Sequence, residues 1–248
     1  MRSLAGALRR VPLRVRAVRG GMDPVSASRL ALGRPGALRL AGRRLDGPNP
    51  RVLGEVATEV AAGEYAAPGF EVRPGDRVID VGANAGAFAV LAAAAGGSVL
   101  AFEPHPDTFR WLERNVAGLD VRPRRAAVVA RPTSRGTARL WLEPGLDVSH
   151  HTAGAETGRA LEVPAVTLEE ALGDGCDLLK LDCEGEELAL FDATAPDVLR
   201  RARRIVVEVH AYVGHPGPLL DALRRAGFVT DYRPKRGAPL GVAFAARR

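Results

Sequence analysis

A short apolar strand that runs into a glycine-containing loop and then a helix most limits what this chain can fold into. Residues 77–81 (RVIDV) predict a buried strand, residues 82–86 (GANAG) the loop, and residues 85–95 an alanine-rich helix. From Arg77 onward, strand-like and helix-like segments alternate along the chain. Such alternation indicates right-handed βαβ units, and therefore an α/β fold with a mainly parallel, doubly wound sheet and helices on both of its faces.

The remaining elements follow from the same patterns. Further strands are predicted at 98–102, 121–129, 137–142, 177–182, 204–209, 228–232 and 240–245, and further helices at 106–117, 167–172, 186–199 (with a break at Pro196) and 218–226. Residues 143–159 are polar and contain glycine, so we expect a loop there. We predict one α/β domain over residues 52–248, preceded by an N-terminal extension over residues 1–51.

The glycine loop is expected to bind a nucleoside. Ligands of open α/β sheets lie beyond the carboxyl ends of the strands, and Gly82 and Gly86 allow a tight turn and a close approach of the backbone. Glu103 ends the next strand, where a carboxylate can accept both ribose hydroxyls of an adenosine. The loop has Asn84 where a dinucleotide site has its second glycine, and no P-loop motif is present. Asp80, just before the loop, suits an ammonium and a sulfonium, so S-adenosylmethionine fits better than NAD.

Three spaced motifs resemble those of one known family. They are 80–86 (DVGANAG), 102–104 (FEP) and 179–187 (LKLDCEGEE), with 163–168 (VPAVTL) and 208–210 (EVH) in similar positions. Together they resemble the FkbM-type methyltransferases over residues 70–232. The sequence departs from that family at Cys183, where an aliphatic residue is usual, and the 143–159 loop is not recognisable.

The resemblance implies a Rossmann-like, class I methyltransferase fold with a seven-stranded sheet whose seventh strand is antiparallel. It also implies S-adenosylmethionine as methyl donor and an alcohol oxygen as acceptor, on sugars, macrolides or related natural products. The residues expected to bind the cofactor are Asp80, Gly82, Ala83, Asn84, Gly86, Glu103, Pro104 and Ala127.

Methylation of an alcohol needs a base, because a protonated alcohol is a poor nucleophile. Asp182 and Glu184 follow one strand and His210 ends the next, so all three are predicted catalytic residues. Simpler roles stay open: Asp182 as a helix cap, His210 as a metal ligand or a histidine bonded to backbone, and Lys180 paired with an acid. His150 and His151 lie in the 143–159 loop and are weaker candidates for the acceptor pocket.

A divalent cation is a second cofactor that the sequence leaves open. Asp182, Glu184, Glu208 and His210 offer hard oxygen ligands and one imidazole, which suits Mg²⁺ or Mn²⁺. Strand alternation opposes all four facing one point.

The positive charge of the chain belongs to its N-terminal extension. Residues 1–51 hold twelve arginines and two aspartates, a net charge of +10, whereas the rest of the chain has a net charge of −4. Residues 1–22 have a basic amphipathic pattern that fits a helix packed on its own domain, a frayed terminus, or peripheral contact with an anionic membrane. No run of 18 apolar residues predicts a membrane-spanning helix, and Cys176 and Cys183 lack zinc or disulfide spacing. We expect a cytoplasmic protein, with contact to a membrane surface left open.

The sequence therefore favours an S-adenosylmethionine-dependent O-methyltransferase that acts on a hydroxyl of a small molecule: a sugar, glycolipid, polyketide or other natural product. A nucleic-acid methyltransferase is an alternative, but the acidic main domain and the Asp182-Cys183-Glu184-Gly185 turn argue against it, so no nucleic-acid partner is expected. An inactive cofactor-binding scaffold tethered by the basic extension is the third hypothesis. The oligomeric state is not indicated.

Overall fold

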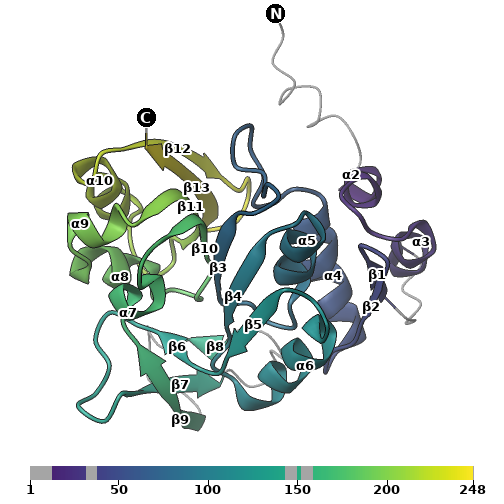
Figure 1. Cartoon of the computed structure of the whole chain (residues 1–248), viewed down its shortest axis with the longest axis horizontal. Coiled ribbons are helices and arrows are strands. Elements are labelled where there is room, and N and C mark those ends of the chain that lie inside the picture. The colour runs from purple at the N-terminus through teal and green to yellow at the C-terminus, as the bar shows by residue number, and fades with distance from the viewer. Residues whose placement is uncertain (1–12, 32–37, 143–149, 152–158, 248) are drawn as a thin grey trace, which may run out of the picture.

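The central element of the structure is a seven-stranded sheet (Figure 1). The computed structural model describes residues 13–31, 38–142, 150–151 and 159–247. Across the sheet the strands are β12 (Phe228–Pro234), β13 (Leu240–Arg247), β11 (Ala202–His210), β10 (Cys176–Leu181), β3 (Arg77–Val81), β4 (Ser98–Phe102) and β5 (Val121–Arg124).

Six of these strands run in the same direction, and β13, the last strand in the sequence, runs in the opposite direction. β3 pairs in parallel with both β4 and β10, and Val81 lies opposite Phe102 on one side and Leu181 on the other. β13 runs antiparallel to both of its neighbours, β11 and β12. This order, with an antiparallel final strand inserted next to the edge, confirms the expected class I methyltransferase fold.

Helices cover both faces of the sheet because successive side chains of the buried strands alternate between them. On one face Ile79, Leu179 and Val207 pack with the helices on the C-terminal side: α7 (Leu168–Leu172), α8 (Glu187–Ala193), α9 (Pro196–Leu199) and α10 (Gly217–Arg225). On the other face Val78 and Val206 share a core with α4 (Pro50–Ala61), α5 (Ala87–Ala94) and α6 (Pro106–Val116).

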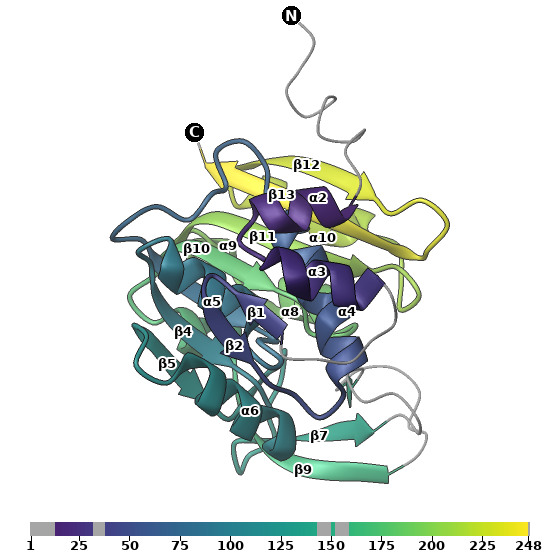
Figure 2. The same cartoon turned by 90° about the vertical axis from the view of Figure 1, so that its right-hand side faces the viewer.

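The described part of the N-terminal extension packs onto the second of these faces. It forms α2 (Leu13–Arg19), α3 (Pro24–Ala31) and a hairpin of β1 (Leu38–Leu40) and β2 (Arg43–Leu45), which Figure 2 shows in front of α4 and α5. Ala17, Met22 and Leu40 are fully buried in the same core as Val78. The boundary predicted between residues 51 and 52 falls within α4. Residues 1–12, and with them half of the basic pattern, lie outside the described residues.

The strand expected at 121–129 and the loop expected at 143–159 differ from the structure. The strand expected at 121–129 is two strands, β5 and β6 (Ala127–Val128), because the chain turns at residues 124–126, where Ala126 N–H donates to the Arg124 carbonyl. β6 leaves the central sheet and pairs with β9 (Arg159–Val166) in a four-stranded sheet completed by β7 (Thr137–Leu142) and β8 (His150–His151). The helix expected at 186–199 forms α8 and α9, and the break predicted at Pro196 is confirmed, since the chain is extended at Thr194 and Ala195.

The loop expected at 143–159 also contains strand structure. β8 lies inside it and β9 begins at its last residue, Arg159. Residues 143–149 and 152–158 lie outside the described residues. In the described part of the chain, no helix combines the length and the apolar character needed to cross a membrane.

Candidate active site

A cavity of about 640 Å³ opens at the carboxyl ends of β3, β4, β10 and β11. Its volume is in the range of small-molecule sites. One side of it is formed by the loop after β3 and by the residues that follow β4, which were predicted to bind the cofactor. Another part of the lining, called the acceptor side below, carries the carboxylates of Glu59, Glu64, Asp182, Glu184 and Glu208.

The loop after β3 is held against β4 by its own backbone. Gly82 N–H and Ala83 N–H both donate to the Phe102 carbonyl, at 3.1 and 2.9 Å. Gly82 and Asn84 have positive φ angles of 71° and 50°. Non-glycine residues rarely adopt this left-handed region, and asparagine tolerates it better than most.

The glycine at position 82 is required for a reason that the sequence did not indicate. A Cβ atom there would collide with the Asp182 carbonyl, because the backbone after β10 crosses directly over the loop. The sequence argument was that Gly82 lets a ligand approach. The structure instead shows the close approach of a neighbouring strand end, which brings Asp182 to the edge of the cofactor loop.

Glu103 lies buried between the loop and the start of α6. Its two carboxylate oxygens accept hydrogen bonds from Asn84 N–H at 3.0 Å and from His105 N–H at 2.9 Å. Burial raises the pKa of Glu103 to about 7, against the opposing effect of these two hydrogen bonds. Each oxygen keeps a second lone pair, and the side chain lines the cavity, so the carboxylate fits the ribose hydroxyls of S-adenosylmethionine.

Most of the other predicted cofactor residues lie on the same wall. Ala83, Asn84, Pro104 and Ala127 line the cavity with Gly82 and Glu103. Gly86 is not among the lining residues: it is the N-cap of α5, with a φ of 93°, and a Cβ there would meet Leu112 at 2.8 Å.

Asp80 lies behind this wall, fully buried and outside the cavity lining. Its carboxylate is 3.0 Å from Lys180 Nζ, which also donates to the Gly82 carbonyl at 2.8 Å. Burial alone would lower the pKa of Lys180, but the charges of Asp80 and Asp182 outweigh burial and raise it. Asp80 thus faces the protein's own ammonium group where the sequence argument had placed the ligand's. Lys180 pairs with an acid, which is the simpler role that the sequence analysis left open for it.

On the acceptor side, one phenol hydroxyl joins two carboxylates. The Tyr65 hydroxyl is 2.8 Å from Asp182 Oδ2 and 3.1 Å from Glu208 Oε2. Since the hydroxyl has one proton, it donates to one carboxylate at a time. Lys235 Nζ lies at 2.9 Å from Glu208 Oε1 and 2.6 Å from Glu64 Oε1, which links β12–β13 to the end of α4.

His210 is fixed at the end of β11 by a buried carboxylate. Its Nδ1 lies 2.9 Å from Glu187 Oε1, and Glu187 also accepts from Cys183 N–H and Gly185 N–H. The other ring nitrogen, Nε2, is 3.4 Å from Glu184 Oε2 and 3.9 Å from Asp182 Oδ1. Glu184 reaches this position with a strained φ of 53°.

The pKa values of His210 and Glu184 indicate which groups of the acceptor side can act as a base. Burial would lower the pKa of His210, but its bond to Glu187 and the nearby carboxylates outweigh burial and raise the pKa to about 9. Burial, followed by the charge of Asp182, raises the pKa of Glu184 to about 7. At neutral pH His210 is therefore an imidazolium that cannot accept a proton, and the carboxylates are the groups able to act as a base.

We expect the charge of His210 to be measurable without any substrate. In an NMR titration the His210 ring should titrate near pH 9, and Glu187→Gln should bring its pKa down, because burial then acts with less opposition. Since the folded-state value lies above the ordinary value of 6.5, the stabilisation by His210 is full below pH 6.5 and is lost as the pH rises through 9. A wild-type ring that titrates at or below 6.5 would contradict this account.

Sequence reasoning missed several residues of this site. Glu59, Glu64 and Tyr65 lie before the region of family resemblance and Lys235 lies after it, so no motif pointed to them. Glu187 was quoted within a motif, but nothing in the sequence indicated that it holds His210. His150 and His151 form β8, and their side chains are not among those described.

Three of the four residues that the sequence offered as ligands for a divalent cation lie close together. Ligand atoms of Asp182, Glu208 and His210 lie within 4.8 Å of one another. The Tyr65 hydroxyl already bonds to two of these residues, and Lys235 pairs with Glu208. A cation would have to compete with these contacts.

The sheet order, the loop after β3 and the acid after β4 define a class I methyltransferase. The sequence model of the FkbM methyltransferase domain matches residues 80–230, and the chain belongs to this family of S-adenosylmethionine-dependent methyltransferases.

Two curated relatives are similar over much of the chain. The chain is 30% identical to the 31-O-demethyl-FK506 methyltransferase FkbM of Streptomyces tacrolimicus over 203 residues, covering 66% of this chain and 76% of the relative. It is 27% identical to the hexuronic acid methyltransferase AglP of Haloferax volcanii, covering 65% and 66%. Among solved structures, fibrillarin from Aeropyrum pernix with bound S-adenosyl-L-methionine aligns at 15% identity with a TM-score of 0.46, covering 71% of this chain and 68% of that one.

Proposed function

We propose that this chain transfers the methyl group of S-adenosylmethionine to a hydroxyl group of a small molecule, such as a sugar, a glycolipid, a polyketide or another natural product. The observation that carries the proposal is the position of Asp182 and Glu184 after β10, where they line one cavity together with Glu103 and the loop after β3. The names of the two curated relatives describe methyl transfer to 31-O-demethyl-FK506 and to a hexuronic acid, which supports a hydroxylated acceptor.

The chemistry assigns different work to the two sides of the cavity. Bound S-adenosylmethionine supplies an electrophilic methyl group. Glu103 accepts the ribose hydroxyls and so fixes the cofactor, while the acceptor side holds a hydroxyl oxygen in line with the methyl group. Asp182 or Glu184 takes the hydroxyl proton as the oxygen attacks, and the pKa of about 7 at Glu184 matches a base that works near neutral pH. The His210 imidazolium lowers the pKa of Glu184 and so opposes the larger effect of burial.

The two rival hypotheses receive less support. A nucleic-acid substrate needs a basic surface at the site, whereas acids outnumber cations among the charged residues that line the cavity. An inactive scaffold does not need Asp182 held by Tyr65 and Lys180, or His210 held by Glu187. We therefore keep a small-molecule acceptor as the proposed partner.

Calorimetric titration with S-adenosylhomocysteine tests the cofactor half of the proposal. We expect micromolar binding of S-adenosylhomocysteine and none of NADH, and Glu103→Ala should weaken the former by about tenfold or more because both ribose hydrogen bonds are lost. Glu113→Ala, an exposed position on α6, is the control and should bind as the wild type does. Binding of NADH in place of S-adenosylhomocysteine would overturn the proposal.

The need for a divalent cation is tested by measuring turnover. Mg²⁺ and Mn²⁺ are each tested with EDTA as the reference, and turnover that requires one of them would assign the ion to Asp182, Glu208 and His210. Full turnover in EDTA would leave acid–base chemistry to the side chains alone.

A further inference from the structure

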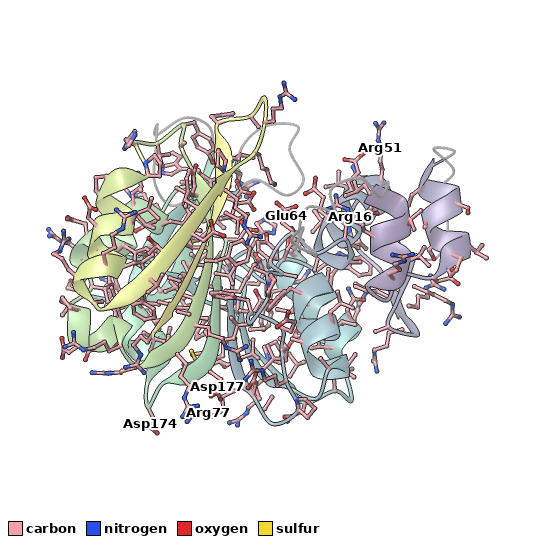
Figure 3. The ribbon with its side chains drawn as sticks, turned by 90° about the horizontal axis from the view of Figure 1, so that it is seen from above. Arg16, Arg51, Glu64, Arg77, Asp174 and Asp177 are labelled. Atoms are coloured by element: carbon pink, nitrogen blue, oxygen red, sulfur yellow. The ribbon has the colours of Figure 1, made fainter. Side chains whose placement is uncertain are left out.

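One buried tyrosine brings its hydroxyl to the carboxylates of the acceptor side. Tyr65 follows α4, lines the cavity and is 7% exposed. Its ring packs edge-on against Phe88 of α5, with a centroid distance of 5.8 Å, and Lys180 Nζ lies 5.2 Å from the ring centroid. Figure 3 shows the preceding residue, Glu64, near the middle of the molecule, away from Arg77 at the start of β3. The packing on the ring therefore fixes where the hydroxyl lies.

The two oxygens of the Asp182 carboxylate have different surroundings. Oδ2 lies 2.8 Å from the Tyr65 hydroxyl and 3.8 Å from Lys180 Nζ. Oδ1 lies 3.9 Å from His210 Nε2, which is beyond hydrogen-bonding distance. Within the described part of the chain no group donates a hydrogen bond to Oδ1, and the Asp182 side chain is 22% exposed. The protein thus uses Oδ2 itself and leaves Oδ1 for a ligand.

A second carboxylate competes for the same hydroxyl proton. Glu208 Oε2 lies 3.1 Å from the Tyr65 hydroxyl, and Glu208 Oε1 lies 2.9 Å from Lys235 Nζ. The shorter contact of 2.8 Å favours donation to Asp182 while Asp182 is ionised. An ionised carboxylate accepts a stronger hydrogen bond than a protonated one. Once Asp182 is protonated, Glu208 is therefore the better acceptor, and the hydroxyl proton turns to it without any movement of the ring.

We propose that Tyr65 is a positioning residue for methyl transfer: by holding Asp182 Oδ2, its hydroxyl turns Oδ1 toward the acceptor and so selects the atom that takes the proton. The acceptor O–H bond breaks as Oδ1 gains the proton, the acceptor oxygen bonds to the methyl carbon, and the bond between that carbon and sulfur breaks. The positive charge on sulfur and the negative charge on Asp182 disappear together, so the net charge of the site does not change. This inference rests on the proposed function and adds the residue that orients its base.

Crystal structures of the wild type and of Tyr65→Phe, both with S-adenosylhomocysteine, test the positioning without an acceptor. Phenylalanine keeps the ring and its packing on Phe88 but removes the hydroxyl. We expect the Asp182 carboxylate of the variant to rotate, so that the distance between Oδ1 and His210 Nε2, 3.9 Å here, changes by more than it does in a control. The control is Tyr232→Phe on β12, outside the cavity lining. An Asp182 carboxylate that keeps its orientation in Tyr65→Phe would overturn the inference.

A double-mutant cycle measures whether Tyr65 acts through Asp182. With the acceptor found by screening hydroxylated sugars and polyketides, Tyr65→Phe should lower kcat by about tenfold or more, because a base that is out of line works poorly, and should leave the affinity for S-adenosylhomocysteine within about threefold. In the Asp182→Asn background the same change should lower kcat by less than about threefold, since no base is left to position. Equal factors in the two backgrounds would mean that Tyr65 only supports the fold.

A second measurement applies if Tyr65→Phe fails to fold. Burial, followed by the charges of Asp182 and Glu208, raises the pKa of Tyr65 well above its ordinary value. Asp182→Asn removes one of these charges, so in a spectrophotometric titration the Tyr65 phenol should ionise at a lower pH than in the wild type. Asp192→Asn, an exposed position on α8, should leave the titration unchanged. A Tyr65 titration unaffected by Asp182→Asn would show that the hydroxyl does not hold this carboxylate.

The positioning role and the proposed function fail in different ways. Absence of S-adenosylhomocysteine binding by the wild type contradicts the proposed function itself. Binding by the wild type, together with an Asp182 carboxylate that does not move in Tyr65→Phe, leaves the function standing and overturns only the role of Tyr65. A kcat that Tyr65→Phe does not lower overturns that role as well.

Discussion

Asp182→Asn should lower kcat by about 10²- to 10⁴-fold, the range that a general base contributes, while the affinity for S-adenosylhomocysteine stays within about threefold. Asp182 lies beside Tyr65, Lys180 and His210 at the end of β10, and these contacts hold its carboxylate in position at the cavity. Asparagine has nearly the same size but cannot take the proton of the acceptor hydroxyl. Initial rates with the acceptor found by screening, together with calorimetry, measure the two quantities.

A matched change on the surface separates catalysis from folding. Asp192→Asn alters an exposed aspartate on α8 and should leave kcat and the urea midpoint unchanged. If Asp182→Asn keeps more than about a tenth of the wild-type kcat, Asp182 is not the base, and Glu184 becomes the candidate to test next.

Gly82→Ala should destabilise the protein by about 2–5 kcal/mol. A left-handed φ costs an alanine about 1–2 kcal/mol, and overpacking costs about 1–3 kcal/mol more. Here the new methyl group meets the Asp182 carbonyl, which belongs to the backbone and cannot rotate away. The chain must therefore shift where β3 and β10 end. Urea unfolding measures the loss, and calorimetry should show weaker binding of S-adenosylhomocysteine as the loop moves.

Gly118 offers the comparison that isolates the collision. It has a similar φ of 76°, but a Cβ at this position meets nothing within 4 Å. Gly118→Ala should therefore lower the free energy of unfolding only by the cost of a left-handed φ in an alanine, about 1–2 kcal/mol. Equal losses for the two variants would show that the contact between Gly82 and the Asp182 carbonyl has no energetic weight.

The sequence predicted the fold well because most of its signals are local. Apolar runs such as residues 77–81 and 204–209 mark the buried strands, and the family motifs supply the order of the sheet. The strand at 121–129 was misjudged because an apolar run continues after the turn at 124–126 and enters a different sheet. Periodicity gives the presence of a strand but not the sheet to which it belongs.

Sequence reasoning predicted only part of the site. Asp182, Glu184 and His210 lie around one cavity, as expected from adjacent strand ends, and their catalytic roles stay predictions. Tyr65 and Lys235 contact the same carboxylates from positions far away in the chain, and only the tertiary structure brings them there. Asp80 was assigned to a ligand because the sequence did not reveal that Lys180 would lie beside it.

The core shared by the two ends of the chain has a consequence for biosynthesis. Ala17 and Met22 belong to the same buried cluster as Val242 and Phe244, which the ribosome adds more than two hundred residues later. Contacts of such long sequence separation form slowly and only after the last strand has emerged. During translation, the part of this cluster that β13 covers therefore stays exposed until residues 240–247 are made. Nascent chains arrested before residue 240 should bind chaperones and remain sensitive to proteases, and chains extended through residue 247 should do neither.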